Sequence, residues 1–204
     1  MPLRLIIGLG NPGPTYTSTR HNAGFMAVDT IHASYEFGPW RSKYQGLVSE
    51  GKLKRRRTYL LKPMTYMNDS GFAVGAAVRF LKLMPSAVVV LHDEIDLAAG
   101  KLKAKTGGGD AGHNGLRSIT AAIGPDYHRV RIGVGHPAKD RVVGHVLQNF
   151  AKADEEWLMP LLSAVAEAAP TLAENDMIGF MNKAALRLKP PGHKPKPEPE
   201  EGGR

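Results

Sequence analysis

Residues 87–91, AVVVL, are the stretch that most limits what this chain can fold into. Five consecutive apolar residues, mostly valine, are typical of a strand that is buried on both of its faces. Residues 3–9 form a second run of strand length. Further strands are predicted at residues 44–49, 58–61 and 127–134 and in the alternating segment around Leu102. Helices are predicted at residues 22–35 and 68–83, from Asn114 onward, and over about 154–186 with breaks near Pro160 and Pro170.

Strands that alternate with helices predict an α/β fold in which helices cover both faces of a sheet. We expect a single domain at residues 1–188 with a twisted, mixed, largely parallel central sheet. A chain of 204 residues is long enough for one hydrophobic core. Residues 189–204 hold five prolines and no aliphatic side chain, which predicts a disordered tail. The segment GKLKRRR at residues 51–57 is predicted as a basic turn between two strands.

The absence of cysteine excludes several kinds of chemistry. Without any cysteine the chain has no disulfide, no thiolate nucleophile and no cysteine-ligated zinc. No apolar stretch approaches the roughly 20 residues that cross a bilayer. The apolar run at the N-terminus is too short for a signal peptide. We therefore expect a cytoplasmic protein with no membrane segment.

The net charge of +8 is typical of proteins that bind an anionic partner, because a basic surface concentrates polyanions near it, but a basic surface that binds no nucleic acid explains the charge equally well. Lys103 and Lys105 alternate along one predicted strand, so both point to one face. Arg129 and Arg131 alternate in the same way along another. A glycine-rich loop before a helix is also a potential anion site. Together these features favour a phosphate-bearing substrate. Taken by itself, the alternation of lysines and arginines is explained equally well by a sheet face that is exposed to solvent.

Gly8, Gly10 and Gly13 reproduce the dinucleotide-binding pattern G-x-G-x-x-G after a strand. That pattern needs a helix to open at once, so that the helix N-terminus meets a pyrophosphate. Two prolines in this loop instead push the residues before them towards extended conformations. The acidic residue expected about 20 positions later at a strand end is also missing. We therefore interpret the glycines as a tight turn that presents Asn11.

Polar side chains stand at the ends of several predicted strands and helices. The stretches that carry them are GNPGPTYTSTRHNAGF at residues 10–25, PMTYMNDSG at 63–71, VVVLHDEID at 88–96 and TGGGDAGHNG at 106–115. Ligands of an open α/β sheet bind outside the carboxyl ends of its strands, so these stretches are expected to meet there. Taken singly, each asparagine is better explained as a turn residue or a helix cap, and the histidine as a surface residue.

Taken together, the polar residues have the chemistry of a hydrolytic site. His21 is the type of residue that acts as a general base near neutral pH, and a carboxylate such as Asp93 fixes the tautomer of its ring. The asparagine amides can donate hydrogen bonds to a carbonyl oxygen or an oxyanion. Since the sequence has neither a G-x-S-x-G motif nor a cysteine, the nucleophile is expected to be water.

The spacing of the histidines does not favour a metal site. The chain has eight histidines but no H-E-x-x-H motif. His92, Asp93 and Asp96 could hold a metal only with ligands from distant segments. We therefore expect no metal and no cofactor.

The four stretches, together with HRVRIGVGHP at residues 128–137, resemble bacterial peptidyl-tRNA hydrolase. The resemblance covers about residues 3–187. It implies a monomeric, metal-free esterase of one α/β domain, which cleaves the ester between a peptide and the 3′ end of tRNA and so recycles the tRNA. The implied partner is peptidyl-tRNA, contacted at its acceptor stem and its 3′ CCA end.

The resemblance also implies roles for individual residues. His21 matches the catalytic base and Asp93 its paired carboxylate, and Asn11 and Asn114 match residues that stabilise the reacting carbonyl. The residues expected to bind the substrate are Tyr16, Met67, Asn68 and His113. The residues expected to bind tRNA phosphates are Lys103, Lys105 and Arg131. Asp110 and Ala111 stand where relatives often carry His-Gly, and an acid there is expected to weaken an anion site in the glycine-rich loop.

Two other functions compete with this one on the residues alone. A non-catalytic RNA-binding module on the same fold explains the charge, but it does not explain a histidine and an aspartate placed with three asparagines. A different α/β hydrolase, such as an aminopeptidase or a nucleoside phosphorylase, is the third candidate. The poor spacing for a metal argues against the aminopeptidase.

Overall fold

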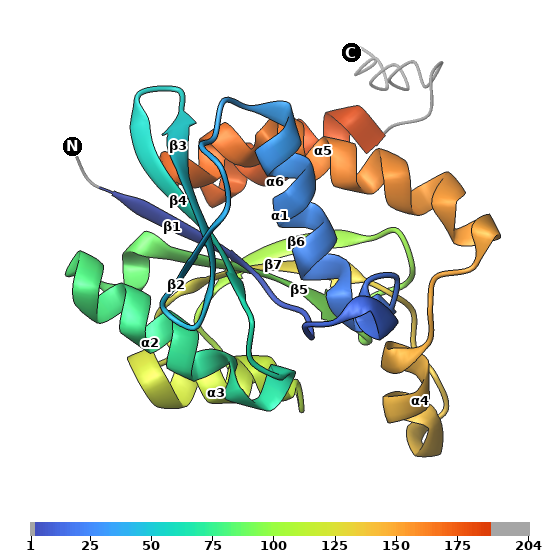
Figure 1. Cartoon of the computed structure of the whole chain (residues 1–204). Coiled ribbons are helices and arrows are strands. Elements are labelled where there is room, and N and C mark those ends of the chain that lie inside the picture. Colours follow the sequence, from blue (N-terminus) through green and yellow to red (C-terminus); the bar gives the residue numbers. More distant parts are fainter. Residues whose placement is uncertain (1–2, 189–204) are drawn as a thin grey trace, which may run out of the picture.

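Seven strands form one sheet in the order β2-β3-β4-β1-β5-β7-β6 (Figure 1). The structure is a computed structural model and describes residues 3–188, so the tail predicted at 189–204 lies outside the described residues. The strands are β1 (Arg4–Gly8), β2 (Arg41–Lys43), β3 (Gly46–Leu53), β4 (Arg56–Pro63), β5 (Val88–Glu94), β6 (Leu102–Thr106) and β7 (His128–Gly133). Residues 88–91 of the predicted apolar run thus belong to the central strand β5, whereas Ala87 ends a single helical turn before it.

The sheet is mixed, and its parallel pairings lie at the centre. β1 pairs in parallel with β4 and with β5, and β5 pairs in parallel with β7. The pairs β2–β3, β3–β4 and β6–β7 are antiparallel. Parallel pairing therefore accounts for half of the described pairings. Because β1 and β5 are parallel neighbours, their carboxyl ends lie side by side, which is where the polar loops were expected to meet.

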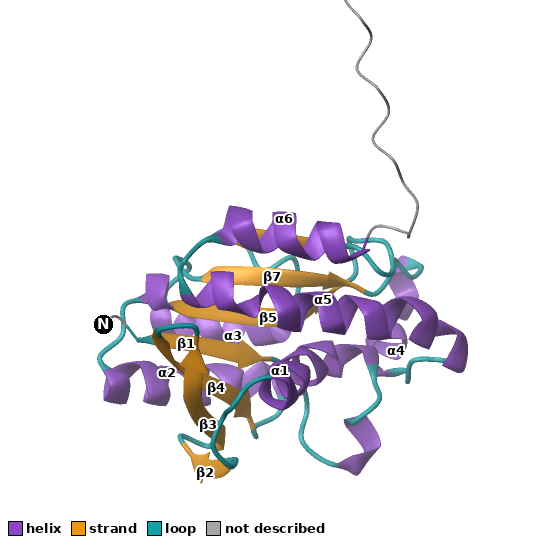
Figure 2. Cartoon of the chain, turned by 90° about the horizontal axis from the view of Figure 1, so that it is seen from above, coloured by secondary structure: helices purple, strands orange, loops and turns teal. Residues whose placement is uncertain are grey.

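Helices cover both faces of the sheet, as predicted, and form one domain with it (Figure 2). The helices are α1 (Ala23–Ser34), α2 (Ser70–Leu81), α3 (Asn114–Ile123), α4 (Val142–Leu147), α5 (Glu155–Ala173) and α6 (Met177–Leu188). One apolar cluster joins the sheet to α1, α5 and α6, and a second joins its other face to α2 and α3. No helix in residues 3–188 has both the length and the apolar character needed to cross a bilayer.

Two predicted elements differ from the structure. Residues 51–57 belong mostly to β3 and β4, and only Lys54 and Arg55 form the turn, with Lys54 at a φ of 53°. The long C-terminal helix is not broken at its prolines, since α5 runs through both Pro160 and Pro170. Its buried apolar side chains outweigh the hydrogen bonds that the prolines remove. The break falls after Ala173 instead, before α6.

Glycines let α1 approach the sheet more closely than any other residue would allow. A Cβ atom on Gly24, at the start of α1, would overlap the backbone of Leu9 and the carbonyl oxygen of Leu91. A Cβ atom on Gly8 would overlap the carbonyl oxygen of Gly24. Of the three glycines in the G-x-G-x-x-G pattern, Gly13 alone has the positive φ of a tight turn, at 107°. The interpretation of these glycines as a turn therefore holds for Gly13 only. The close contact places the residues before α1 over the ends of β1 and β5.

Candidate active site

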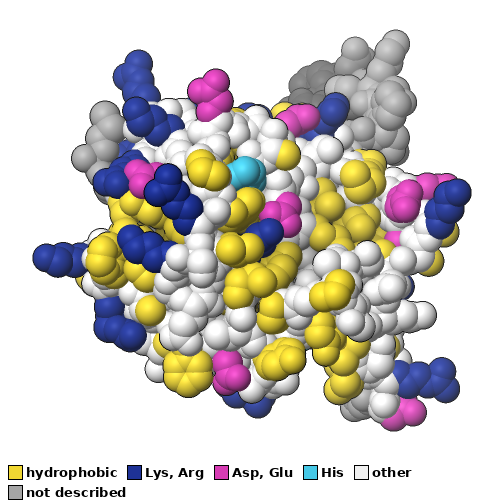
Figure 3. All heavy atoms as spheres, in the orientation of Figure 1, with side chains coloured by type: hydrophobic (Ala, Val, Ile, Leu, Met, Phe, Trp, Pro, Cys, Tyr) yellow, Lys and Arg dark blue, Asp and Glu magenta, His cyan; other side chains and the backbone are white. Residues whose placement is uncertain are grey.

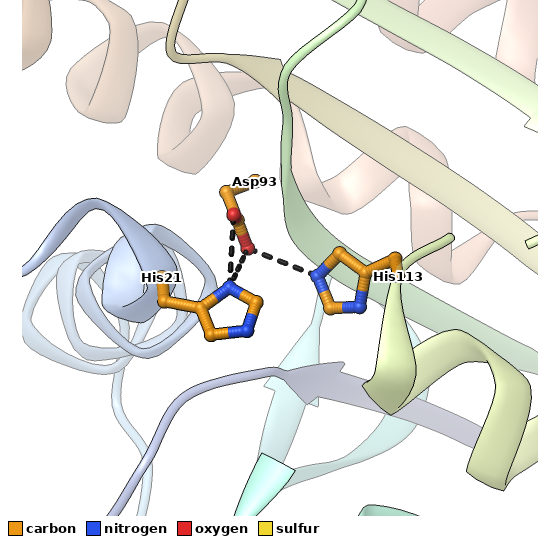
Figure 4. A group of neighbouring side chains, drawn as sticks. All are labelled: His21, Asp93 and His113. Atoms are coloured by element: carbon orange, nitrogen blue, oxygen red, sulfur yellow. Dashed lines mark hydrogen bonds and ion pairs between the residues drawn. The ribbon is translucent and has the colours of Figure 1, made fainter. Parts of the chain in front are cut away.

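His21 and Asp93 come from the two segments that meet at this edge of the sheet. Asp93 lies near the end of β5, and its side chain is 1% exposed. His21 lies in a single helical turn, Arg20–Asn22, directly before α1. Its Nδ1 atom is 2.9 Å from each carboxylate oxygen of Asp93 (Figure 4). The predicted pair is therefore in hydrogen-bonding contact.

The contact with Asp93 decides which ring nitrogen of His21 is available for chemistry. A carboxylate only accepts hydrogen bonds, so the proton of the neutral ring sits on Nδ1 and is donated to Asp93. Nε2 is then the unprotonated nitrogen. It points away from Asp93, and His21 lines a cavity of about 530 Å³. This arrangement suits a ring that takes a proton from a molecule in the cavity.

His113 holds the same carboxylate from the opposite side (Figure 4). It is the N-cap residue of α3, and its Nδ1 accepts hydrogen bonds from the amides of Gly115 and Leu116. Its proton is therefore on Nε2, which donates to Oδ1 of Asp93 at 3.0 Å. The prediction that Asn114 caps this helix is wrong, because Asn114 is the first helical residue and His113 caps it with its ring.

The two rings keep the Asp93 carboxylate charged. Complete burial alone would raise the pKa of Asp93, since water is removed from the charged form. The neighbouring rings of His21 and His113 outweigh that effect and lower the pKa far below its usual range. A buried negative charge thus lies against His21, where it can stabilise the imidazolium that forms when the ring takes a proton.

Asn11 is held so that one end of its amide is free. Its Oδ1 accepts the backbone amide of Met67 at 2.8 Å, and its side chain is nearly buried. Because the oxygen is occupied, Nδ2 remains to donate into the cavity that Asn11 lines. Asn22, which the sequence analysis missed, fixes the backbone of Asn11 with two hydrogen bonds, at 2.8 and 3.0 Å. The only signal for Asn22 was its place beside His21.

The cavity brings most of the predicted site residues together. Its lining includes the predicted residues Asn11, Tyr16, His21, Met67, Asn68, Asp93, His113 and Asn114. Asn68 makes no side-chain hydrogen bond to a helix end, and the residue before α2 is Asp69, so Asn68 does not cap that helix. One wall consists of Val142, Val143, Val146 and Leu147 from α4, a helix that was not predicted. The site therefore combines polar groups on the sheet side with an apolar wall.

His21, Asp93 and His113 are also the residues best placed for a metal. Within residues 3–188 they form the one group of potential ligands, with ligand atoms within 4.8 Å of one another. A cation would have to replace the two ring protons that now face Asp93. The set considered from the sequence, His92 with Asp93 and Asp96, does not converge in the described residues. His92 is buried with a pKa lowered to about 3 by burial and the nearby His113, and it hydrogen-bonds the backbone oxygen of Asp93.

The chain was compared with protein families, with curated proteins and with solved structures. Residues 5–192 match the model of the family described as peptidyl-tRNA hydrolase. The chain belongs to the peptidyl-tRNA hydrolase family. It is 60% identical over 189 residues to the peptidyl-tRNA hydrolase of Roseobacter denitrificans, covering 92% of this chain and 81% of that protein. It is 56% identical over 190 residues to that of Cereibacter sphaeroides, covering 93% and 84%.

A crystal structure of peptidyl-tRNA hydrolase from Acinetobacter baumannii has the same fold. It superposes with a TM-score of 0.85 at 39% identity, covering 89% of this chain and 94% of that one. These relatives confirm the family that the sequence motifs predicted, together with its class of enzyme. They leave the roles of individual residues in this member of the peptidyl-tRNA hydrolase family as predictions.

The predicted phosphate-binding residues of this hydrolase lie beside the cavity, on the face of the sheet that carries α3. Lys103 and Lys105 are exposed on β6, and Lys103 is paired in register with Arg131 on β7. Arg131 is less available, because its side chain is 22% exposed and pairs with Glu94 at 2.9 Å. In the glycine-rich loop, the Asp110 carboxylate accepts the amide of Gly112. An anion bound in this loop would need the same amide as a donor, and Asp110 already occupies it. This contact is a physical reason to expect a weak anion site in the loop.

Arg129 has a different place from its neighbour Arg131. Although both point to one face of β7, Arg129 is 1% exposed and lies beneath the glycine-rich loop. Its guanidinium donates to the carbonyl oxygens of Gly109 and Gly108, at 2.5 and 2.7 Å. A sheet face exposed to solvent was the other explanation for the alternation of Arg129 and Arg131. That explanation is wrong for Arg129, because its side chain is buried. The buried guanidinium instead holds the loop that leads to His113.

Replacing Arg129 by methionine is expected to loosen this loop. The variant loses two charge-assisted hydrogen bonds, so amide hydrogen exchange at Gly112 and His113 should accelerate at least about tenfold. Exchange followed by NMR measures this directly. Arg131→Met removes the neighbouring arginine and serves as the matched control, which should leave both amides unchanged. Equal exchange rates in the two variants would show that Arg129 does not order the loop.

Proposed function

We propose that this chain hydrolyses the ester bond between a peptide and the 3′ end of tRNA, with water as the nucleophile and His21 as the general base. The observation that carries the proposal is the His21–Asp93 contact, which leaves the unprotonated Nε2 of His21 facing a cavity. Family membership supports the substrate class. A protein that only binds RNA would have no need of this arrangement.

In the proposed reaction, water attacks the ester carbonyl and transfers a proton to Nε2 of His21. Asp93, kept ionised between two rings, stabilises the imidazolium. The oxyanion of the tetrahedral intermediate accepts hydrogen bonds from the Nδ2 groups of Asn11 and Asn114. When the intermediate collapses, His21 returns the proton to the 3′ oxygen of the ribose. The products are a free peptide carboxylate and an intact tRNA.

The remaining residues of the cavity are proposed to hold the substrate. Tyr16, Met67, Asn68 and His113 line the cavity and would contact the peptide and the terminal adenosine. Lys103, Lys105 and Arg131 would bind phosphates of the acceptor stem, so that the 3′ CCA end enters the cavity. We propose that the enzyme works as a monomer, since the described chain supplies every group of this scheme. We propose the cytoplasm as its compartment, in keeping with the proposed tRNA substrate.

The decisive assay measures release of tRNA from N-acetylated aminoacyl-tRNA and from free aminoacyl-tRNA, with and without EDTA. We expect cleavage of the acetylated substrate only, at the same rate in EDTA. Failure to cleave it while tRNA still binds would overturn the proposal and leave an RNA-binding module. Loss of activity in EDTA, restored by a divalent cation, would instead mean that His21, Asp93 and His113 hold a metal.

A further inference from the structure

Nearly all of the net charge of the chain lies in one short segment. Residues 41–62 contain eight lysines and arginines and one acidic residue, Glu50, a net charge of +7 out of +8 for the whole chain. This segment forms β2, β3 and β4. None of it belongs to the cavity of the active site or to the proposed acceptor-stem contacts. The proposed function therefore leaves the strongest electrostatic feature of the molecule unexplained.

The segment forms a hollowed basic surface at the edge of the sheet opposite β6. Six strand spacings separate β2 from β6, which is about 29 Å. In the register of β3 and β4, Lys52 faces Arg57 and Glu50 faces Tyr59, so these side chains share one face. Figure 3 shows Lys and Arg side chains gathered on the left of the molecule, around the β3–β4 hairpin. A hollow of about 570 Å³ is lined by Arg41, Lys43, Val48, Glu50, Lys52, Arg57 and Tyr59, among others. We call this surface the β2–β4 basic hollow.

Most cations of the β2–β4 basic hollow are free to meet a ligand. Arg57 pairs with Glu50, whereas Arg41, Lys43 and Lys52 are exposed and form no ion pair within residues 3–188. Aromatic rings lie among them. The Nζ atom of Lys43 is 4.5 Å from the ring centre of Phe80, whose ring is 64% exposed. Tyr59 lies within the hollow itself.

This combination favours RNA over the other common polyanion, an anionic membrane. Membrane-surface segments pair their cations with exposed apolar side chains that enter the lipid. No large exposed hydrophobic side chain of the described chain lies within residues 41–62, and Phe80, which contacts Lys43, is a single exposed ring beside them rather than an apolar face. RNA-binding surfaces instead combine cations for phosphates with aromatic rings that stack on bases. The β2–β4 basic hollow likewise combines cations with aromatic rings.

We propose that the β2–β4 basic hollow binds the phosphate backbone of a second RNA segment, outside the part of the substrate that enters the active site. Four to six strand spacings, about 19–29 Å, separate the strands of the hollow from β6, so the hollow and the surface of Lys103 and Lys105 are separate. The surface would keep the enzyme near RNA between rounds of hydrolysis, because phosphate contacts of this kind are independent of sequence. The inference needs no catalytic step, and its test is separate from the hydrolysis assay.

The test compares two variants that remove the same charge. Arg41→Gln/Lys52→Gln alters the hollow, and Lys152→Gln/Lys183→Gln removes two exposed lysines that form no ion pair in the described chain and lie far from residues 41–62 in sequence. The probe is a blunt-ended RNA hairpin without a single-stranded 3′ end, followed by fluorescence anisotropy over a series of KCl concentrations. We expect the first variant to bind roughly tenfold more weakly, with a salt slope reduced by about two. The control should match the wild type, and both variants should keep kcat/KM.

Three results would overturn the inference. Equal binding by the two variants would mean that the hollow makes no specific contribution. A rise in KM for peptidyl-tRNA in the hollow variant would mean that the surface holds the substrate tRNA itself rather than a second segment. Loss of binding to phosphatidylserine vesicles with unchanged RNA binding would identify a membrane surface. Thermal unfolding of each variant confirms that the fold is intact in every case.

Discussion

Replacing His21 by alanine is expected to lower kcat by about 10²–10⁴-fold, the usual effect of losing a general base. The buried carboxylate of Asp93 fixes the tautomer of the ring, and its unprotonated Nε2 has no partner in the described chain, whereas the unprotonated Nδ1 of His113 already accepts two backbone amides. The measurement is single-turnover hydrolysis of N-acetylated aminoacyl-tRNA, which separates the chemical step from product release.

The matched control for this variant is His32→Ala. His32 also belongs to the α1 segment, but its ring stacks on Trp40 and hydrogen-bonds the backbone of Gly38, away from the cavity. It should retain kcat within a few-fold. If His21→Ala also retains kcat within a few-fold while remaining folded, His21 is not the base and the proposed mechanism is wrong.

Replacing Asp93 by asparagine is expected to lower kcat by a similar factor, about 10²–10⁴. The reason lies in the fixed tautomer of His113. Since Nδ1 of His113 accepts from two backbone amides, its Nε2 must donate, and the new amide must turn its oxygen towards it. The amide NH₂ group then faces Nδ1 of His21. Both oxygen positions of the Asp93 carboxylate lie 2.9 Å from that nitrogen, so the NH₂ group competes with the amide oxygen for it. Where the NH₂ group donates to Nδ1, the proton of the ring moves to Nε2 and the ring can no longer act as a base.

A second substitution tests this explanation against simple loss of charge. In Asp93→Asn/His113→Ala the amide is no longer held in one orientation, so its oxygen can turn towards Nδ1 of His21. We expect kcat of the double variant to exceed that of Asp93→Asn by several-fold. If the double variant is equally slow or slower, the amide orientation does not control the tautomer of His21, and the missing charge alone explains the loss.

The sequence was sufficient to predict which polar residues lie together, because these residues stand where strands end. His21 and Asp93 follow or end the two most apolar strands, β1 and β5, and the rule for open α/β sheets places such residues together. Asn11 and His113 lie in loops at the same edge. None of these positions depends on the exact bounds of a helix or strand. Errors in the predicted bounds therefore did not change which residues were expected to lie together.

The parts that could not be predicted depend on contacts between distant segments. Alternation along β7 places Arg129 and Arg131 on one face, but it does not indicate that the glycine-rich loop covers only Arg129. The role of Asn22 rests on a pairing with the backbone of Asn11 across the turn. The prolines of α5 indicated two breaks, because local rules do not include the burial that holds that helix together. In each case tertiary packing decided the outcome.

The glycine contact between α1 and the sheet has a consequence for how the enzyme loses activity. His21 and Asp93 are 72 positions apart along the chain, and the docking of Gly24 against Leu9 and Leu91 lets α1 lie close enough for them to meet. A partly unfolded molecule in which α1 has detached retains Asp93 in the sheet but loses the contact with His21, the proposed base. Detachment of α1 is therefore sufficient for inactivation, and the denaturation curve followed by hydrolysis should fall no later than the curve followed by helix content. Activity would then report whether α1 is docked on the sheet.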